Sequence, residues 1–92
     1  MIVKNFEDIN ISNFPVVIFG SGPAGISTAI ELEKKNIKTL IIEAGNSEYS
    51  DKSQEFYKGK IVGDQISDLS ESRLRQFGGT SGHWGGWVKP ME

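Results

Sequence analysis

Two glycine-rich stretches contain the residues whose types and spacing point to chemistry. The first, GSGPAG at residues 20–25, has glycines at its first, third and last positions. Free backbone N–H groups in such a turn, together with the positive end of a following helix, attract phosphate groups. The second, GGTSGHWGG at residues 78–86, combines five glycines with two hydroxyl side chains and the single histidine of the chain. It suggests a second helix start that faces a phosphate.

Each residue of the first stretch has a distinct expected role. Gly20 allows a sharp turn off a strand, Gly22 lets the backbone approach a pyrophosphate, and Gly25 lets helix and strand pack closely. Pro23 suits the first turn of a helix, where no N–H is needed, and Ala24 follows it in the motif. The stretch therefore predicts a dinucleotide-binding turn.

An acidic residue stands where such a site needs one. Glu43 lies about 20 residues beyond the glycines, at the end of the apolar run TLII. A carboxylate there accepts hydrogen bonds from both hydroxyls of an adenosine ribose and repels a 2′-phosphate. The position argues against NADP and leaves NAD and FAD open.

The elements that must position these residues form one β-α-β unit. The run VVIF predicts a buried parallel strand over about 15–20, apolar residues at helical spacing predict a helix over about 23–36, and TLIIE predicts a second strand over about 38–43. Asn36 tolerates the left-handed conformation that often ends a helix. A right-handed crossover joins the two parallel strands.

The expected fold class is α/β, the N-terminal portion of a Rossmann-like FAD/NAD(P)-binding domain. Two strands and one helix cannot cover both faces of a parallel sheet, so we expect the 92 residues to be incomplete as an isolated fold. Ile66, Leu69 and Phe77 should then be partly exposed.

Composition excludes several classes of function. The chain contains no cysteine, so a disulfide framework, a thiolate metal site and a CxxC redox pair are excluded from it. A formal charge of −2 gives no reason to expect nucleic acid as a partner. The longest apolar runs are too short for a membrane segment, and the N-terminus lacks the pattern of a signal peptide, so a cytoplasmic location is expected.

The second glycine stretch distinguishes the two remaining cofactors. Gly78 and Gly79 bring the backbone close to a ligand, and Thr80 or Ser81 can cap a helix. NAD has no need of a second such site within this distance, whereas FAD lies against protein along its whole length. His83, one helical turn further on, would then face the isoalloxazine ring.

The two motifs in this order resemble the glucose-methanol-choline (GMC) family of flavoprotein oxidoreductases. The resemblance rests on GSGPAG with Glu43 and on RLRQFGGTSGHWGG at residues 73–86. It implies that residues 1–92 are the N-terminal part of an FAD-binding domain whose second flavin motif is 78–86. It also implies a substrate domain outside this chain and oxidation of a CH–OH group of a small alcohol, sugar or polyol by hydride transfer to flavin.

Within that family, GGTSGHW is similar to the version found in pyranose oxidases, where the histidine matching His83 is joined covalently to the flavin. Other members have a different residue there and bind FAD noncovalently, so both modes of binding stay open. The family's catalytic pair, a histidine with a second histidine or an asparagine, has no match in this chain, and no catalytic residue is assigned. Trp84 and Gly85 complete the expected cofactor contacts.

Several interpretations remain open from sequence alone. Arg73 and Arg75 either reach a phosphate or order the loop before the double glycine. Trp84 and Trp87 either flank the flavin or are ordinary packing aromatics. The alternatives to a GMC-type oxidoreductase are a noncatalytic FAD- or ADP-binding protein and the start of an NAD-dependent dehydrogenase.

Overall fold

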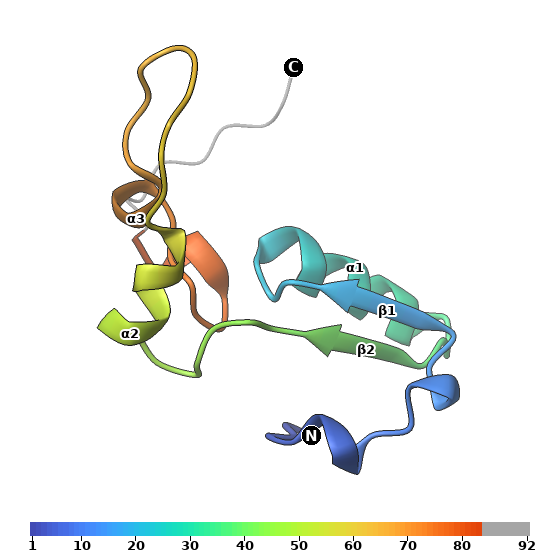
Figure 1. Cartoon of the computed structure of the whole chain (residues 1–92). Helices are drawn as coiled ribbons and strands as arrows, with labels where there is room; N and C mark the ends of the chain where they lie inside the picture. Colours follow the sequence, from blue (N-terminus) through green and yellow to red (C-terminus); the bar gives the residue numbers. More distant parts are fainter. Residues whose placement is uncertain (84–92) are drawn as a thin grey trace, which may run out of the picture.

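The computed structural model describes residues 1–83, which form two short strands and a series of helices (Figure 1). In chain order the elements are the 3₁₀ helices η1 (Phe6–Asp8) and η2 (Ile11–Asn13), strand β1 (Val16–Phe19), helix α1 (Pro23–Lys34), strand β2 (Thr39–Ile42), helix α2 (Asp51–Gln54), 3₁₀ helix η3 (Glu55–Tyr57), helix α3 (Leu69–Ser72) and 3₁₀ helix η4 (Gly79–His83). No helix within residues 1–83 is long and apolar enough to cross a membrane.

The β-α-β unit predicted from the sequence is present. β1 and β2 pair in parallel, from Val16 opposite Thr39 to Phe19 opposite Ile42, with α1 packed against both strands. Each element is slightly shorter than expected, and β1 ends where Gly20 turns with a φ of 97°. Asn36 has a φ of 57°, so the predicted left-handed residue does follow α1. The fold is a partial Rossmann-like α/β fold.

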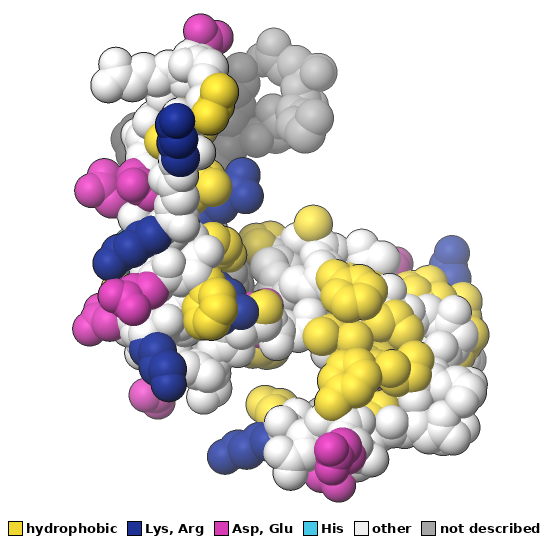
Figure 2. Space-filling view, viewed as in Figure 1, with side chains coloured by type: hydrophobic (Ala, Val, Ile, Leu, Met, Phe, Trp, Pro, Cys, Tyr) yellow, Lys and Arg dark blue, Asp and Glu magenta, His cyan; other side chains and the backbone are white. Residues whose placement is uncertain are grey.

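The strands are not buried on both faces, in contrast to what their apolar runs suggested. Every side chain of β2 is only half-buried, and Phe19 at the end of β1 is 81% exposed. The physical reason is that α1 is the one long helix among the described residues, and one helix covers one face of a sheet. Figure 2 shows the resulting hydrophobic surface over the β-α-β unit. Ile66 and Phe77 are exposed and Leu69 is half-buried, as expected.

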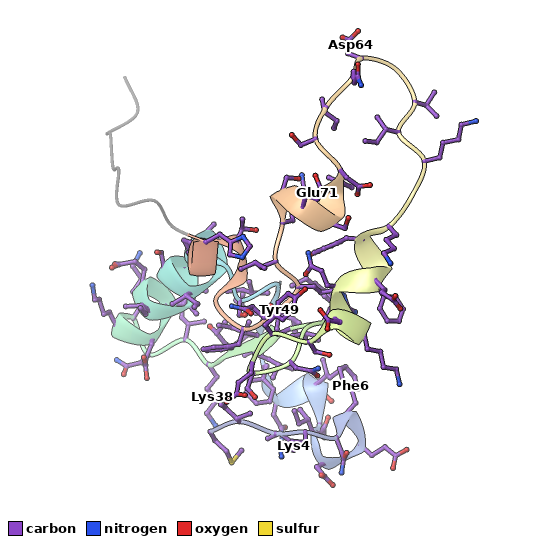
Figure 3. The ribbon with its side chains drawn as sticks, turned by 90° about the vertical axis from the view of Figure 1, so that its left-hand side faces the viewer. Lys4, Phe6, Lys38, Tyr49, Asp64 and Glu71 are labelled. Carbon is purple, nitrogen blue, oxygen red and sulfur yellow. The ribbon has the colours of Figure 1, made fainter. Side chains whose placement is uncertain are left out.

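A second group of elements, built from α2, η3, α3 and η4, lies beside the β-α-β unit (Figure 1). The buried side chain of Gln54 holds it together: its Nε2 donates to the carbonyl oxygens of Ser70 and Arg73, and its Oε1 accepts from Arg75 N at 3.1 Å. Both N–H groups and the oxygen of the side-chain amide are therefore hydrogen-bonded. The loop between η3 and α3 extends away from this cluster, with Asp64 at its tip (Figure 3).

The two groups meet through closely packed backbone. Asn46 and Gln76 form a parallel β-bridge, and Phe77 N donates to Asn46 O at 2.8 Å. A Cβ atom added to Gly45 would lie 2.4 Å from backbone atoms of Arg75 and Gln76, far inside van der Waals contact. Glycine at position 45 is therefore required for the segment before the second glycine stretch to pack against the loop that follows β2.

This junction yields a first prediction. Gly45→Ala should lower the free energy of unfolding by about 1–3 kcal/mol, because the contacting atoms are backbone and cannot move aside cheaply. Hydrogen exchange of the Phe77 amide, measured in the full-length protein, should become faster. The matched control is Gly59→Ala, since a Cβ at Gly59 meets no atom within 4 Å; it should change stability by no more than about 0.5 kcal/mol. Equal effects of the two substitutions would contradict the close approach.

Candidate nucleotide-binding site

The first glycine stretch forms a tight turn between β1 and α1. Gly20 N donates to Ile42 O at 2.8 Å, which ties the turn to β2. A Cβ at Gly25 would lie 2.1 Å from Gly20 O and 3.3 Å from the side chain of Ile18. Glycine at position 25 thus allows helix and strand to pack closely, as the sequence predicted.

Gly22 has a different environment from Gly25. A Cβ added there would meet no protein atom within 4 Å, so packing within the described chain does not require glycine at this position. Gly22 is also the N-cap residue of α1, no side chain caps the helix there, and Pro23 follows as its first residue. The amides of the first turn, including that of Ala24, have no carbonyl partner within the helix. The start of α1 is therefore open and attractive to an anion.

Glu43 directly follows β2 and accepts three hydrogen bonds from the chain. Its Oε2 accepts from Ser21 N at 2.8 Å and from Ser21 Oγ at 2.6 Å, and its Oε1 accepts from Gly45 N at 2.7 Å. The carboxylate therefore braces the glycine turn against the loop after β2.

These contacts keep Glu43 ionised. Partial burial raises the pKa of its carboxyl group, but hydrogen bonds from the Ser21 hydroxyl and from the backbone N–H groups of Ser21, Gly45 and Ala44 outweigh it. The net pKa lies below the ordinary value of 4.5. The site therefore has a fixed negative charge at neutral pH.

Ser21 connects the first glycine stretch to the second. Its side chain is fully buried, at 0% exposure, and its Oγ accepts from Gly78 N at 3.1 Å while donating to Glu43. Gly78 and Gly79 both have positive φ, at 86° and 66°. A Cβ at Gly79 would lie 3.2 Å from Gly22 Cα. The two motifs, far apart in the sequence, are therefore in direct contact.

The expected capping role required Thr80 or Ser81 to stand just before a helix. Neither residue does so. Thr80 and Ser81 lie inside η4, because the left-handed turn at Gly78 and Gly79 makes the helical turn begin at Gly79 itself. Thr80 Oγ1 instead accepts from Leu74 N at 3.2 Å, and Ser81 Oγ donates to Gly78 O at 2.6 Å. Both hydroxyls thus stabilise the turn.

The remaining predicted residues have contrasting positions. His83 is the exposed last residue of η4. Arg75 Nη1 donates to Ser53 Oγ at 2.9 Å, and its guanidinium carbon lies 4.6 Å from the ring centre of Phe56. This geometry supports the interpretation in which Arg75 orders the loop before the double glycine. Trp84, Gly85 and Trp87 lie outside the described residues.

Two residues that the sequence did not single out help to build the site. Ser21 stands at the variable position between Gly20 and Gly22, and Gly45 begins what reads as a plain polar loop. A serine between two glycines is an ordinary turn residue, so its buried role had no sequence signal. Gly45 likewise gave no sign that another segment packs against it.

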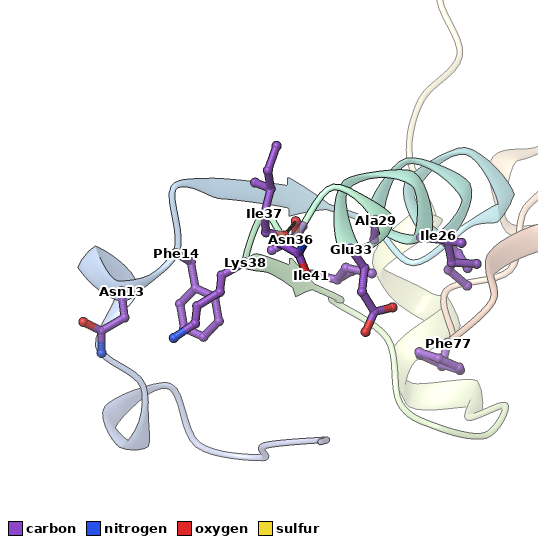
Figure 4. A pocket seen from close by; sticks show the side chains of 12 residues that line it. Asn13, Phe14, Ile26, Ala29, Glu33, Asn36, Ile37, Lys38, Ile41 and Phe77 are labelled. Atoms are coloured by element: carbon purple, nitrogen blue, oxygen red, sulfur yellow. Dashed lines mark hydrogen bonds between the residues drawn. The ribbon is translucent and has the colours of Figure 1, made fainter.

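A hollow among the described residues does not coincide with this site. Its lining is mainly apolar and comes from the N-terminal segment, α1, β2 and Phe77 (Figure 4). Neither Glu43 nor any residue of the glycine turn lines it. No group of three or more histidine or acidic residues among the described residues could hold a metal ion.

Comparison with known proteins gives two findings. Residues 13–66, which contain the whole β-α-β unit, match a family described as FAD binding domain. The chain is 34% identical over 70 residues to the thioredoxin reductase of Listeria monocytogenes and 31% identical to that of Bacillus subtilis, which covers 71% of the chain and 22% of each relative. The chain thus spans about a fifth of the length of these relatives. No solved structure gives a significant match.

The hydrogen bonds to Glu43 predict a pH dependence. Glu43→Gln should destabilise the protein at neutral pH, because the amide NH₂ would face N–H donors. Since the folded pKa lies below 4.5, the stabilising contribution of the carboxylate is complete above pH 4.5 and is lost as the pH falls through the folded pKa. The difference in unfolding free energy between wild type and Glu43→Gln should therefore shrink in acid. Glu48→Gln, at an exposed position, is the control. A difference that stayed constant in acid would contradict the assignment.

Proposed function

This chain belongs to the FAD binding domain family, and from that premise we propose that its two glycine stretches together hold FAD in an oxidoreductase. The residues fit the cofactor. The start of α1 is uncapped, the space beside Gly22 is open, and the ionised carboxylate of Glu43 lies next to the turn. Each of these features matches one chemical group of the dinucleotide.

In this proposal the pyrophosphate lies at the turn formed by residues 20–25. The amides of Gly22, Ala24 and Gly25 donate to its oxygens, and the positive end of the α1 dipole adds to the attraction. Pro23 contributes a preorganised helix start and no competing donor. The adenosine ribose lies against Glu43, whose ionised carboxylate accepts from its hydroxyls.

The second stretch continues along the cofactor from the pyrophosphate. The contact between Gly79 and Gly22 supports this course, because it brings the second backbone segment to the same turn. Gly78, Gly79 and the η4 residues Thr80 and Ser81 then line the middle of FAD, and His83 meets the isoalloxazine ring. Trp84 and Gly85 belong to this surface on sequence grounds alone.

Gly22 offers the sharpest test of the binding site. A methyl group at position 22 meets no protein atom within 4 Å, so Gly22→Ala should fold normally. It would occupy the space through which the pyrophosphate approaches, and FAD affinity should fall by at least about tenfold. Flavin content after purification and apoprotein titration with FAD measure the effect, with Gly59→Ala as control. Full flavin retention by Gly22→Ala would contradict the site.

We further propose that the flavin accepts hydride from a CH–OH group of a small alcohol, sugar or polyol, as in GMC oxidoreductases. FAD supplies the two-electron acceptor. The observation that supports this class is the convergence of the two motifs, since GGTSGHW resembles the flavin-contacting segment of pyranose oxidases. Residues 1–92 would be the N-terminal part of the FAD domain, with the substrate domain and catalytic residues elsewhere. A histidine at position 83 can stabilise reduced flavin through its charge or bind it covalently.

A second candidate is reduction of a disulfide-containing protein, which the matched thioredoxin reductases favour. This reaction requires a pair of thiols close to the flavin. The chain contains no cysteine, so such a pair would have to come from outside these 92 residues.

Anaerobic spectroscopy on the full-length protein separates the two candidates. We expect that one member of a panel of aldoses, polyols and primary alcohols bleaches the flavin absorption. Oxidised thioredoxin should not reoxidise photoreduced flavin. Rapid reoxidation by thioredoxin, with no bleaching by any CH–OH donor, would instead support the second candidate.

A further inference from the structure

We propose that Ser21 is a positioning residue that couples Glu43 to the second glycine stretch, so that both segments bind FAD as one unit. The inference rests on the proposed FAD site. It concerns a residue that occupies a variable position of the first motif and donates no group to the cofactor in that proposal.

The hydrogen bonds of Ser21 carry this inference. Its hydroxyl donates to Glu43 Oε2 at 2.6 Å and accepts from Gly78 N at 3.1 Å, while its own amide donates to the same carboxylate oxygen at 2.8 Å. The side chain is fully buried, so water does not compete for these groups. A hydroxyl has one hydrogen to donate, and that hydrogen is committed to Glu43.

The bond to Gly78 links two segments that are 57 residues apart. Within residues 1–83 it is the hydrogen bond that joins the turn of residues 20–25 to the second glycine stretch. Gly79 also approaches Gly22 closely, but such a van der Waals contact has no preferred direction and does not orient the two segments. Ser21 therefore fixes the register of one motif on the other.

Charge strengthens this link. A hydroxyl that donates to a carboxylate is polarised, and its oxygen becomes a better acceptor for a further N–H donor. The charge on Glu43 is thus transmitted through Ser21 to Gly78 N. Neutralising Glu43 should loosen the second stretch even though Glu43 and Gly78 do not share a hydrogen bond.

The decisive measurement compares FAD with ADP, which lacks the flavin half. Both affinities are measured on the full-length apoprotein for wild type, Ser21→Ala and Thr28→Ala. Thr28 is the matched control, because its hydroxyl donates only to Ala24 O on the same helix at 2.8 Å. In Ser21→Ala the ratio of FAD affinity to ADP affinity should fall about threefold to tenfold. In Thr28→Ala the ratio should not change.

The outcomes are distinguishable from those of the parent proposal. If wild type binds FAD and Ser21→Ala loses affinity equally for FAD and ADP, Ser21 is merely structural and the inference is overturned. If wild type binds neither ligand, the proposed function fails, and the coupling fails with it.

A second measurement does not depend on the folding of Ser21→Ala. In the wild-type holoprotein the Gly78 amide should exchange slowly with solvent, and Glu43→Gln should accelerate that exchange. Exchange of the wild-type Gly78 amide at the rate of an exposed loop amide would overturn the link directly. So would slow exchange that Glu43→Gln leaves unchanged.

Discussion

The buried hydrogen-bond chain from Glu43 through Ser21 to Gly78 is the interaction on which the described structure depends. A buried hydroxyl and a partly buried carboxylate are costly unless their hydrogen-bonding groups are satisfied. Here they satisfy one another, together with backbone N–H groups of the glycine turn and of Gly45. The same contacts that remove this cost bring the phosphate-binding turn, the acidic residue and the second glycine stretch together.

Backbone contacts, more than a hydrophobic core, organise this part of the chain. Leu74 is the one buried hydrophobic residue within residues 1–83, and the strands stay half-exposed. Glycines at positions 25, 45 and 79 let backbone approach backbone at points where a side chain would collide or crowd. The site therefore lies just past the carboxyl ends of two parallel strands, where α/β folds commonly bind nucleotides.

The two glycine stretches support functional statements at different levels of detail. The family match covers residues 13–66 and rests on the first motif and its β-α-β unit, which establishes FAD binding. The finer proposal depends on residues 78–86, which lie beyond that match.

Local sequence patterns were enough to predict the order β1, α1, β2, the turn at residues 20–25, the left-handed Asn36 and the acid at the end of β2. These features depend on sterics and hydrogen bonding among near neighbours, so local patterns are sufficient to predict them. The folded chain was needed to reveal that Arg75 contacts Ser53, that Thr80 and Ser81 lie inside η4, and that Gly45 packs on Arg75. The role of Ser21 belongs to the same group. Its partners lie 22 and 57 residues away, and the path of the chain between them, which no local pattern encodes, sets which groups meet.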